Sequence, residues 1–303
     1  MSKSSPARGL IALLRLPYWL MTGGLAVLTA FAILNGNFAD VPTLIGNMNV
    51  GVVALLTFFS MAFIASAGFA INDYFDRESD AVIKPKRPIP AGALTYKQAV
   101  AVSAILFALG LALSALINWL SFAIIAVDSL LLLVYSYLIK RKSGFAANLL
   151  MGVLTGTAFI FGEATVTGNI SFISLTLYPI AFGTIGGNVL RDIFSLEGDS
   201  KVGYPTLPQK IGTISAAKVG AVFFLLTGLL APFPALPIFA GHFTLYYLPL
   251  IVIWSILLIY SAIRLFVSAS TIVDIRKYER LVTMSMMLLP LALIVEGIMG
   301  WLL

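Results

Sequence analysis

The 303-residue sequence contains no cysteine and one histidine, His242, and only 11% of its residues are charged. The lack of cysteine excludes a disulfide framework, a zinc–thiolate site and a cysteine nucleophile. A single histidine also excludes a histidine-rich metal site. Soluble domains have about 25% charged residues, so the shortage of charge argues against a cytosolic enzyme, a disordered chain and a nucleic-acid-binding protein. No nucleic-acid partner is therefore expected.

Apolar residues are abundant instead, at 60% of the chain, and the mean hydropathy is +1.00. A helix needs about 20 apolar residues to cross a bilayer. The alternating pattern of membrane-spanning strands is absent, and helices satisfy their own backbone polar groups in lipid. The sequence therefore predicts an all-α, polytopic membrane protein with nine transmembrane helices bundled around a central apolar cavity. The nine stretches are about 16–36, 50–71, 97–116, 119–139, 145–165, 170–190, 214–234, 245–266 and 282–302.

The net charge of +6 comes from 19 Lys and Arg against 13 Asp and Glu. All 19 basic residues lie in the amino-terminal arm or in alternate connections, and the connections between those contain none. Loops rich in positive charge face the cytoplasm. We expect an integral protein of the cell membrane, with its amino terminus and basic loops inside and its carboxyl terminus outside. Residues 1–303 are expected to form one transmembrane domain, with cytoplasmic motif loops at about 72–96 and 191–213.

Seven of the 13 acidic residues lie in two short runs, at the cytoplasmic ends of the second and sixth spans. In the first run Asn72, Asp76 and Asp80 are four residues apart, which places them on one helix face, and Asp73 borders that face. Like charges at this spacing repel each other. A divalent cation removes the repulsion, and Mg²⁺ prefers oxygen ligands of this kind. The first run therefore predicts a Mg²⁺ site.

The second run places Asp192 and Asp199 two helical turns apart, with Ser195 between them and Asn188 one turn earlier. Two helices thus offer oxygen ligands at the same membrane depth. Paired carboxylates beside basic residues indicate an anionic phosphate ligand, because Mg²⁺ bridges carboxylate and phosphate while cationic side chains contact the remaining oxygens. The residues predicted to bind diphosphate are Arg77, Lys84, Arg87, Lys140 and Lys201.

The segment after the first run has three prolines and one glycine between residues 84 and 92. Such a stiffened, positively charged loop is suited to close over a phosphate. Thr95 and Gln98 then predict a capping box at the start of the third span. Asp128 and Glu296 lie inside spans, where charge is costly. For Asp128 we expect a hydrogen bond to a partner helix rather than catalysis.

These motifs resemble the UbiA superfamily of intramembrane prenyltransferases. Residues 72–80 match its first pattern, N-D-x-x-D-x-x-x-D, at every defined position, and Arg87-Pro88-Ile89-Pro90-x-Gly92 is similar to the segment that follows in the family. The second pattern, D-x-x-D-x-x-x-D, is matched at Asp192 and Asp199, with Ser195 where many members carry Asp. The resemblance implies nine transmembrane helices and Mg²⁺ on both motifs. It further implies that a polyprenyl diphosphate ionises there and that an acceptor captures the allylic cation.

The resemblance also implies roles for individual residues. It makes Asp76, Asp80, Asp192 and Asp199 catalytic, with Asn72 and Asp73 as further metal ligands. Tyr135 and Lys140 are similar to a Tyr and a Lys that help to bind substrate near the end of the family's fourth span. Asn148 matches an Asn that opens the fifth. The full set expected to bind substrate is Arg15, Tyr135, Asn148, Asn188 and Ser195.

The acceptor is indicated by the segment from Arg15 to Val27, by Glu197-Gly198-Asp199 and by Thr206-Leu207-Pro208, which resemble an archaeal branch of the family. In that branch a geranylgeranyl group is transferred to geranylgeranylglyceryl phosphate in ether-lipid synthesis, and this is the favoured function. One alternative is prenylation of an aromatic ring for quinone synthesis. An alternative of another class is a transporter or a lipid-binding protein. The expected partners are a prenyl diphosphate, a lipophilic acceptor and membrane lipid, with no obligate protein partner.

Overall fold

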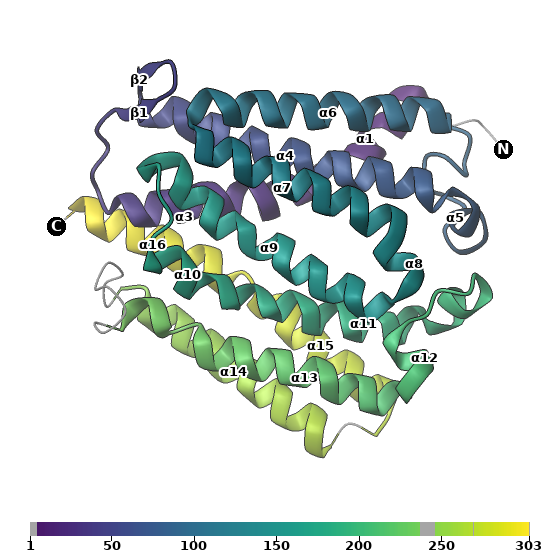
Figure 1. Ribbon diagram of the computed structural model, residues 1–303. Coiled ribbons are helices and arrows are strands. Elements are labelled where there is room, and N and C mark those ends of the chain that lie inside the picture. The colour runs from purple at the N-terminus through teal and green to yellow at the C-terminus, as the bar shows by residue number, and fades with distance from the viewer. Residues whose placement is uncertain (1–4, 237–245, 269, 303) are drawn as a thin grey trace.

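The computed structural model describes residues 5–236, 246–268 and 270–302, which are almost entirely helical (Figure 1). Nine helical segments among these residues are long and apolar enough to cross a membrane, which confirms the predicted number of spans and the all-α class. His242 lies outside the described residues. The nine segments are Pro6–Leu34, Val50–Phe75, Tyr96–Ile117, Trp119–Lys142, Gly144–Thr167, Phe172–Lys201, Thr213–Ala235, Leu248–Val267 and Ile272–Leu302.

Several spans are divided into shorter elements by a π-turn, a 3₁₀ turn or a kink. The helical elements in chain order are α1 (Pro6–Leu14), α2 (Pro17–Trp19), the π-helix η1 (Leu20–Gly24), α3 (Leu25–Leu34), α4 (Val50–Phe75), α5 (Arg77–Ile83), α6 (Tyr96–Ile117), α7 (Trp119–Val134), the π-helix η2 (Tyr135–Ile139), α8 (Lys140–Lys142), α9 (Gly144–Thr167), α10 (Phe172–Leu177), η3 (Tyr178–Ala181), α11 (Phe182–Lys201), α12 (Leu207–Ile211), α13 (Thr213–Leu230), η4 (Phe233–Ala235), α14 (Leu248–Val267), α15 (Ile272–Ser285) and α16 (Leu288–Leu302).

The structure differs from the predicted boundaries mainly at polar helix ends. The first and last spans begin at Pro6 and Ile272, about ten residues before the expected starts, and the sixth continues to Lys201. Residues 191–201, expected in a loop, are therefore helical. Intrahelical hydrogen bonds do not require apolar side chains, so helices run past the stretch that hydropathy detects. A short antiparallel hairpin, β1 (Val41–Thr43) and β2 (Gly46–Met48), was also not expected.

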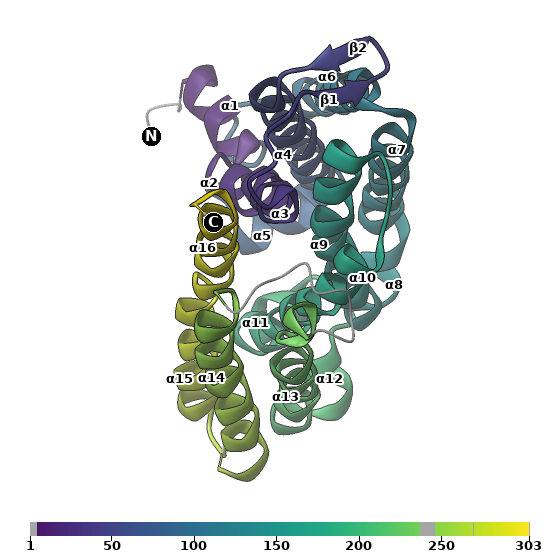
Figure 2. The ribbon, with the colours of Figure 1, turned by 90° about the vertical axis from the view of Figure 1, so that its left-hand side faces the viewer.

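The helices form two groups with α9 and α11 between them (Figures 1 and 2). In one group α4 packs along α6 and α7, and in the other α13 packs along α14. Helix α11 contacts both α9 and α13, and α3 contacts α9 and α16. The elements α5, α8 and α12 lie at one end of the bundle, and the hairpin lies at the other (Figure 1). The turns that follow the two acidic motifs therefore meet at a single end.

A close helix contact fixes the position of α11, which carries the second motif. A Cβ atom on Gly186 would lie 2.6 Å from the carbonyl oxygen of Gly220 on α13, so a larger side chain would push the two helices apart. Small residues permit such close backbone approach between helices in membranes. The apolar core around this contact runs from α11 through α13 to α14 and α16. The second motif is thereby held by the carboxyl-terminal half of the bundle.

Candidate active site

The first motif lies across a break between α4 and α5. Asp76 occupies the break itself, with φ −87° and ψ 0°, in a region of backbone conformation that active-site residues often adopt. Asp73, Asp76 and Asp80 are all buried, with no more than 4% of each residue exposed. Asn72 donates from Nδ2 to Asp76 Oδ2 at 2.8 Å, so the predicted shared face does form across the break. Three carboxylates are thus held together out of solvent.

Each of these carboxylates has a cationic partner from elsewhere in the chain. Asp73 Oδ1 accepts from Arg15 at 2.7 Å and from Arg87 at 3.0 Å. Arg87 also pairs with Asp80, and Lys140 pairs with Asp76. Unpaired buried charges carry a desolvation penalty of several kcal/mol each. The cations therefore make the burial of the motif possible.

Arg15 reaches the motif because a turn between α1 and α2 is fixed on α4. Its backbone is left-handed, with φ 50° and ψ 52°, a conformation that costs about 1–3 kcal/mol in a non-glycine residue. The Ser66 hydroxyl donates to the Leu14 carbonyl at 2.7 Å and accepts from Trp19 Nε1 at 2.7 Å. The Arg15 guanidinium lies 4.4 Å from the Phe69 ring centre. These contacts compensate for the strain and direct Arg15 toward Asp73.

The proline-rich loop places Arg87. The loop turns back on itself, because the Arg87 N–H donates to the Lys84 carbonyl and the Ala91 N–H donates to the Arg87 carbonyl, each at 2.9 Å. Burial opposes the positive charge of Arg87, but Asp73 and Asp80 outweigh it and raise the pKa of the guanidinium. The capping box of Thr95 and Gln98 forms as predicted at the start of α6.

The π-helix η2 places Lys140, and π-turns are frequent at functional sites. Burial alone would raise the pKa of the Asp76 carboxyl. The Lys140 ammonium, together with hydrogen bonds from Lys140, Tyr204 and Asn72, holds that pKa below its ordinary value. Tyr135, at the start of η2, interacts electrostatically with both Asp76 and Asp192. It therefore lies near both motifs.

The second motif is held by neutral partners. Asp192 Oδ2 accepts from Asn148 Nδ2 on α9 at 2.8 Å. Asp199 Oδ2 accepts from the Ser195 hydroxyl at 2.5 Å. In the described part of the chain neither carboxylate forms an ion pair. Ser195 thus supplies a hydrogen bond at the position where many members of the resembled family carry a third carboxylate.

Several expected site residues point elsewhere. Arg77 pairs with exposed Glu78 at 3.2 Å and lies over the Tyr74 ring. Lys201 pairs with exposed Glu197 at 2.7 Å. In the described structure neither pair contacts a motif carboxylate.

Two further residues were expected at the site, Asn188 on the helix of the second motif and Lys84 in the loop after the first motif. Asn188 accepts a hydrogen bond from the exposed Arg191 at 3.1 Å. Lys84 is exposed and forms no close pair in the described structure, but it interacts electrostatically with Asp80 and Asp199. Of the two, Lys84 is near enough to carboxylates of both motifs to interact with their charges.

Tyr204 is a site residue that the sequence did not indicate. Its hydroxyl donates to Asp76 Oδ1 at 2.6 Å and lies 3.0 Å from the Ser79 hydroxyl. Its ring lies 5.0 Å from Lys140 Nζ. Burial and the hydrogen bond to Asp76 raise the pKa of the phenol. Tyr204 matches no motif pattern, and its position relative to Asp76 depends on how the bundle folds.

The donor set of the first motif fits a hard divalent cation. Asn72 Oδ1 is buried without a hydrogen-bond partner, beside the Asp76 carboxylate that accepts from the same side chain. In the described residues no group of three or more His, Asp and Glu side chains is arranged to hold a metal. Mg²⁺ does not need such a group, because it commonly uses one or two carboxylates, water and substrate phosphate.

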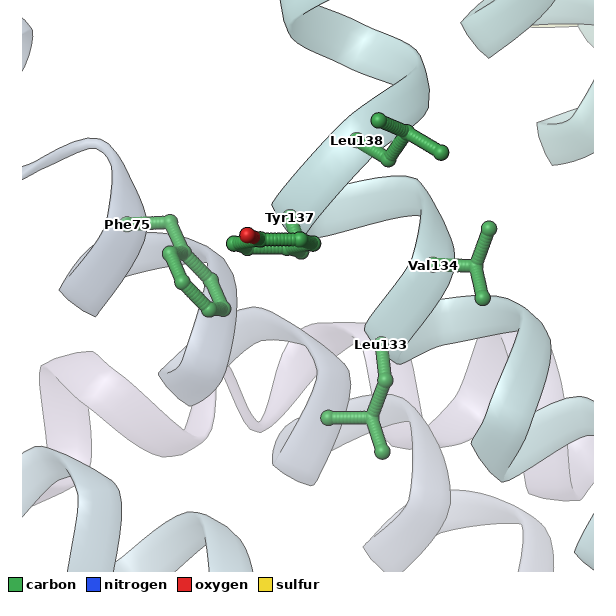
Figure 3. Close-up of a pocket in the computed structure, with 5 residues that line it drawn as sticks. All are labelled: Phe75, Leu133, Val134, Tyr137 and Leu138. Carbon is green, nitrogen blue, oxygen red and sulfur yellow. The ribbon is translucent and has the colours of Figure 1, made fainter.

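Two surface grooves adjoin this end of the bundle. One, of about 260 Å³, is lined by Phe75, Leu133, Val134, Tyr137 and Leu138 (Figure 3). The figure shows the Phe75 and Tyr137 rings close together from different helices. With no acid or cation in its lining, this groove lacks the groups for catalysis. The other, of about 430 Å³, contains Arg141 and is bounded by Ser79 and Tyr204.

The acidic residues inside the spans have structural partners. Asp128 on α7 accepts from the Thr157 hydroxyl on α9 at 2.7 Å, so the expected bond to a partner helix is confirmed. Glu296 is fully buried in α16 and accepts from the Tyr247 N–H at 3.1 Å. Both bonds join neighbouring segments away from the two motifs.

Comparison with known proteins identifies the chain's relatives. The sequence profile of the UbiA prenyltransferase family matches residues 25–289. A digeranylgeranylglyceryl phosphate synthase of Natronomonas pharaonis is 34% identical over 229 residues, which cover 76% of this chain and 78% of the relative. The synthase of the same name from Methanosarcina mazei is 35% identical over 240 residues, which cover 76% and 80%.

Solved structures have the same fold. A structure reported for digeranylgeranylglyceryl phosphate synthase in membranes superposes with a TM-score of 0.78 at 28% identity, covering 97% of this chain and 99% of the other. A UbiA homologue from Archaeoglobus fulgidus bound to GPP and Mg²⁺ superposes with a TM-score of 0.62 at 19% identity, covering 94% and 99%.

Proposed function

Because the chain belongs to the UbiA prenyltransferase family, we propose that it transfers a geranylgeranyl group from geranylgeranyl diphosphate to geranylgeranylglyceryl phosphate, in a Mg²⁺-dependent step of ether-lipid synthesis. The chain is an integral membrane enzyme that transfers prenyl groups. The observation that carries the proposal is the cluster of Asp73, Asp76 and Asp80 with their cations, facing the second motif at one end of the bundle. The names of the relatives support the acceptor.

The proposed metal ligands are the oxygens of the two motifs. In the first they are Asn72, Asp76 and Asp80, with Asp73 beside them. In the second they are Asp192 and Asp199. Bound Mg²⁺ would supply positive charge that stabilises diphosphate as a leaving group. The orphaned Asn72 Oδ1 supports this assignment, because a buried amide oxygen without a donor is costly and a cation satisfies it.

The chain's cations are proposed to bind the diphosphate oxygens. Arg87, Lys140 and Arg15 already converge on the first motif, so they would contact phosphate beside it without a large movement. A preorganised set of donors stabilises charge that develops in the transition state. Lys84 is a further candidate because it interacts with carboxylates of both motifs. Arg77 and Lys201, which pair with exposed glutamates, have no place in this set.

The bond changes follow from this arrangement. The C–O bond between the allylic carbon and the diphosphate breaks, and the electron pair leaves with the diphosphate. The hydroxyl oxygen of the acceptor then forms the new ether bond to the allylic carbon. Its proton is lost afterwards from a strongly acidic oxonium, so no strong base is required. Surrounding spans exclude water, which would otherwise capture the cation. Tyr135, near both motifs, is proposed to contact substrate.

The cellular arrangement is proposed from charge. The motif turns and the basic segments would face the cytoplasm, because positive loops are retained there. The chain would act as one membrane domain over residues 1–303, in the cell membrane. The termini at opposite ends of the bundle agree with an odd number of spans (Figure 1).

An acceptor screen tests the proposal. Purified protein with Mg²⁺ would receive labelled geranylgeranyl diphosphate and one of three acceptors: geranylgeranylglyceryl phosphate, 4-hydroxybenzoate or a naphthoate. We expect a labelled ether lipid and release of diphosphate with the first acceptor only. Transfer to an aromatic acceptor instead would replace the proposed function by quinone-precursor prenylation. No release of diphosphate with any acceptor would contradict an enzymatic function.

A further inference from the structure

The turn after the second motif connects three parts of the site. Residues 202–206 leave the end of α11, where the Tyr204 N–H donates to the Asp199 carbonyl at 3.0 Å. The Pro205 carbonyl accepts from the Gly144 N–H at 3.0 Å, which fixes the turn on the start of α9. The backbone of this turn is therefore anchored on the second motif and on α9 before Tyr204 reaches across to the first motif.

The Tyr204 side chain completes the hydrogen bonds of a single carboxylate. Asp76 Oδ2 is already engaged by Asn72 and Lys140, and the Tyr204 hydroxyl donates to the other oxygen, Oδ1, at 2.6 Å. The Ser79 hydroxyl, on the first turn of α5, lies 3.0 Å from the same phenol. The backbone of Asp76 stays hydrogen-bonded across the break between α4 and α5, to the Asn72 carbonyl at 2.8 Å and from the Asp80 N–H at 2.7 Å. The direction of its carboxylate is set by the side chains of Asn72, Lys140 and Tyr204.

We propose that Tyr204 is a positioning residue for the metal site of the first motif: its hydroxyl fixes the Asp76 carboxylate, and the turn that carries it couples that carboxylate to the second motif. This inference rests on the proposed function. Hydrogen-bonding partners of metal-ligating carboxylates hold the ligands in place, and their loss typically weakens metal affinity by about 10–100-fold. Tyr204 also lines the groove that contains Arg141.

Tyr204→Phe tests the inference because it removes the hydroxyl and keeps the ring beside Lys140. Binding of Mn²⁺ to the full-length purified protein, without substrate, would be followed by the electron paramagnetic resonance of free Mn²⁺. We expect Mn²⁺ affinity to fall about tenfold. In the transfer assay the Mg²⁺ concentration for half-maximal rate should rise by a similar factor, while kcat at saturating Mg²⁺ recovers to within about twofold of wild type.

Ser79→Ala and Tyr260→Phe are the companion variants. Ser79→Ala removes the second partner of the phenol and also the bond that the Ser79 hydroxyl donates to the Asp76 carbonyl at 2.8 Å. It should weaken Mn²⁺ binding about two- to threefold, as for a neutral hydrogen bond. This variant keeps the inference testable if Tyr204→Phe does not fold. Tyr260 is exposed on α14, and Tyr260→Phe should leave Mn²⁺ binding unchanged.

The results separate this inference from the proposed function. Unchanged Mn²⁺ affinity in Tyr204→Phe, or a kcat reduced equally at every Mg²⁺ concentration, would overturn the positioning role. Wild-type protein that binds Mn²⁺ but transfers no prenyl group would overturn the proposed function, and the Mn²⁺ titration of the variants would still decide the role of Tyr204. Wild-type protein that binds no Mn²⁺, either alone or with the prenyl diphosphate present, would overturn both.

Discussion

The two acidic motifs lie at the same end of the bundle, yet their charges are balanced differently. The first has three buried carboxylates, and Arg15, Arg87 and Lys140 pair with them. The second has two carboxylates whose close partners are the neutral side chains of Asn148 and Ser195. The first motif is thus electrically balanced without a metal, whereas the second retains net negative charge.

This difference predicts different roles for the two motifs in binding metal and diphosphate. Excess negative charge in a poorly solvated place attracts a divalent cation strongly. The second motif would therefore depend more strongly on a bound divalent metal than the first motif does. The first motif instead holds cationic side chains in place for the substrate. These side chains can also donate to a bound diphosphate, because Arg and Lys donate to phosphate as readily as to carboxylate. Four variants, from the largest expected effect to the smallest, test this comparison.

Asp76→Asn removes the negative charge at the centre of the first motif with almost no change of shape. Lys140 then loses its partner, and Tyr204 and Asn72 no longer act on an anion. We expect prenyl transfer to fall by about 10³-fold, the upper range for loss of one element of transition-state charge stabilisation. Release of labelled diphosphate measures the rate. Normal turnover with an unchanged Mg²⁺ requirement would show that the first motif is not the metal site.

Arg87→Gln tests whether a cationic side chain that pairs with the first motif also binds the prenyl diphosphate. Arg87 bridges Asp73 and Asp80, so its loss leaves Asp80 without the cation that pairs with it. We expect kcat/KM for the prenyl diphosphate to fall about 10²-fold, as for loss of charge-assisted hydrogen bonds. Arg77→Gln is the matched control, because Arg77 is also a cation of this segment but pairs with exposed Glu78. Equal effects of the two variants would contradict the distinction.

Ser195→Asp would make the second motif carry three carboxylates. The new charge lies one turn from Asp192 and one turn from Asp199, so the metal-free protein should melt at a lower temperature. Divalent metal should restore stability, and the Mg²⁺ concentration for half-maximal rate should fall about tenfold because ligand charge governs affinity. Ser195→Ala serves as the control for loss of the hydroxyl. A weaker Mg²⁺ response in Ser195→Asp would argue against metal binding at the second motif.

Lys201→Ala should have the smallest effect. Lys201 follows the second motif closely in sequence, but it pairs with exposed Glu197 and contacts no motif carboxylate. We expect the KM for the prenyl diphosphate to change by less than about twofold, as for an exposed ion pair screened by water. A tenfold or larger rise in KM would place Lys201 at the diphosphate after all.

Sequence predicted the fold class and the number of spans because apolar length and loop charge are local properties. It also predicted the shared face of Asn72 and Asp76, since helical spacing places residues four apart on one face. It did not separate Arg87 from Arg77, which lie near each other in sequence and are both basic. That choice depends on the turn at 84–92, which directs only Arg87 toward Asp73 and Asp80.

What the sequence determined by itself is therefore a nine-span membrane protein with two acidic motifs and positive charge at one end, because hydropathy, helical period and charge placement need no knowledge of neighbours. The tertiary structure alone decided which cation pairs with which carboxylate. It turned Arg15 onto Asp73 through a left-handed backbone and brought Tyr204 to Asp76 across 128 residues of chain. Such contacts depend on how distant helices pack, and no local pattern encodes them.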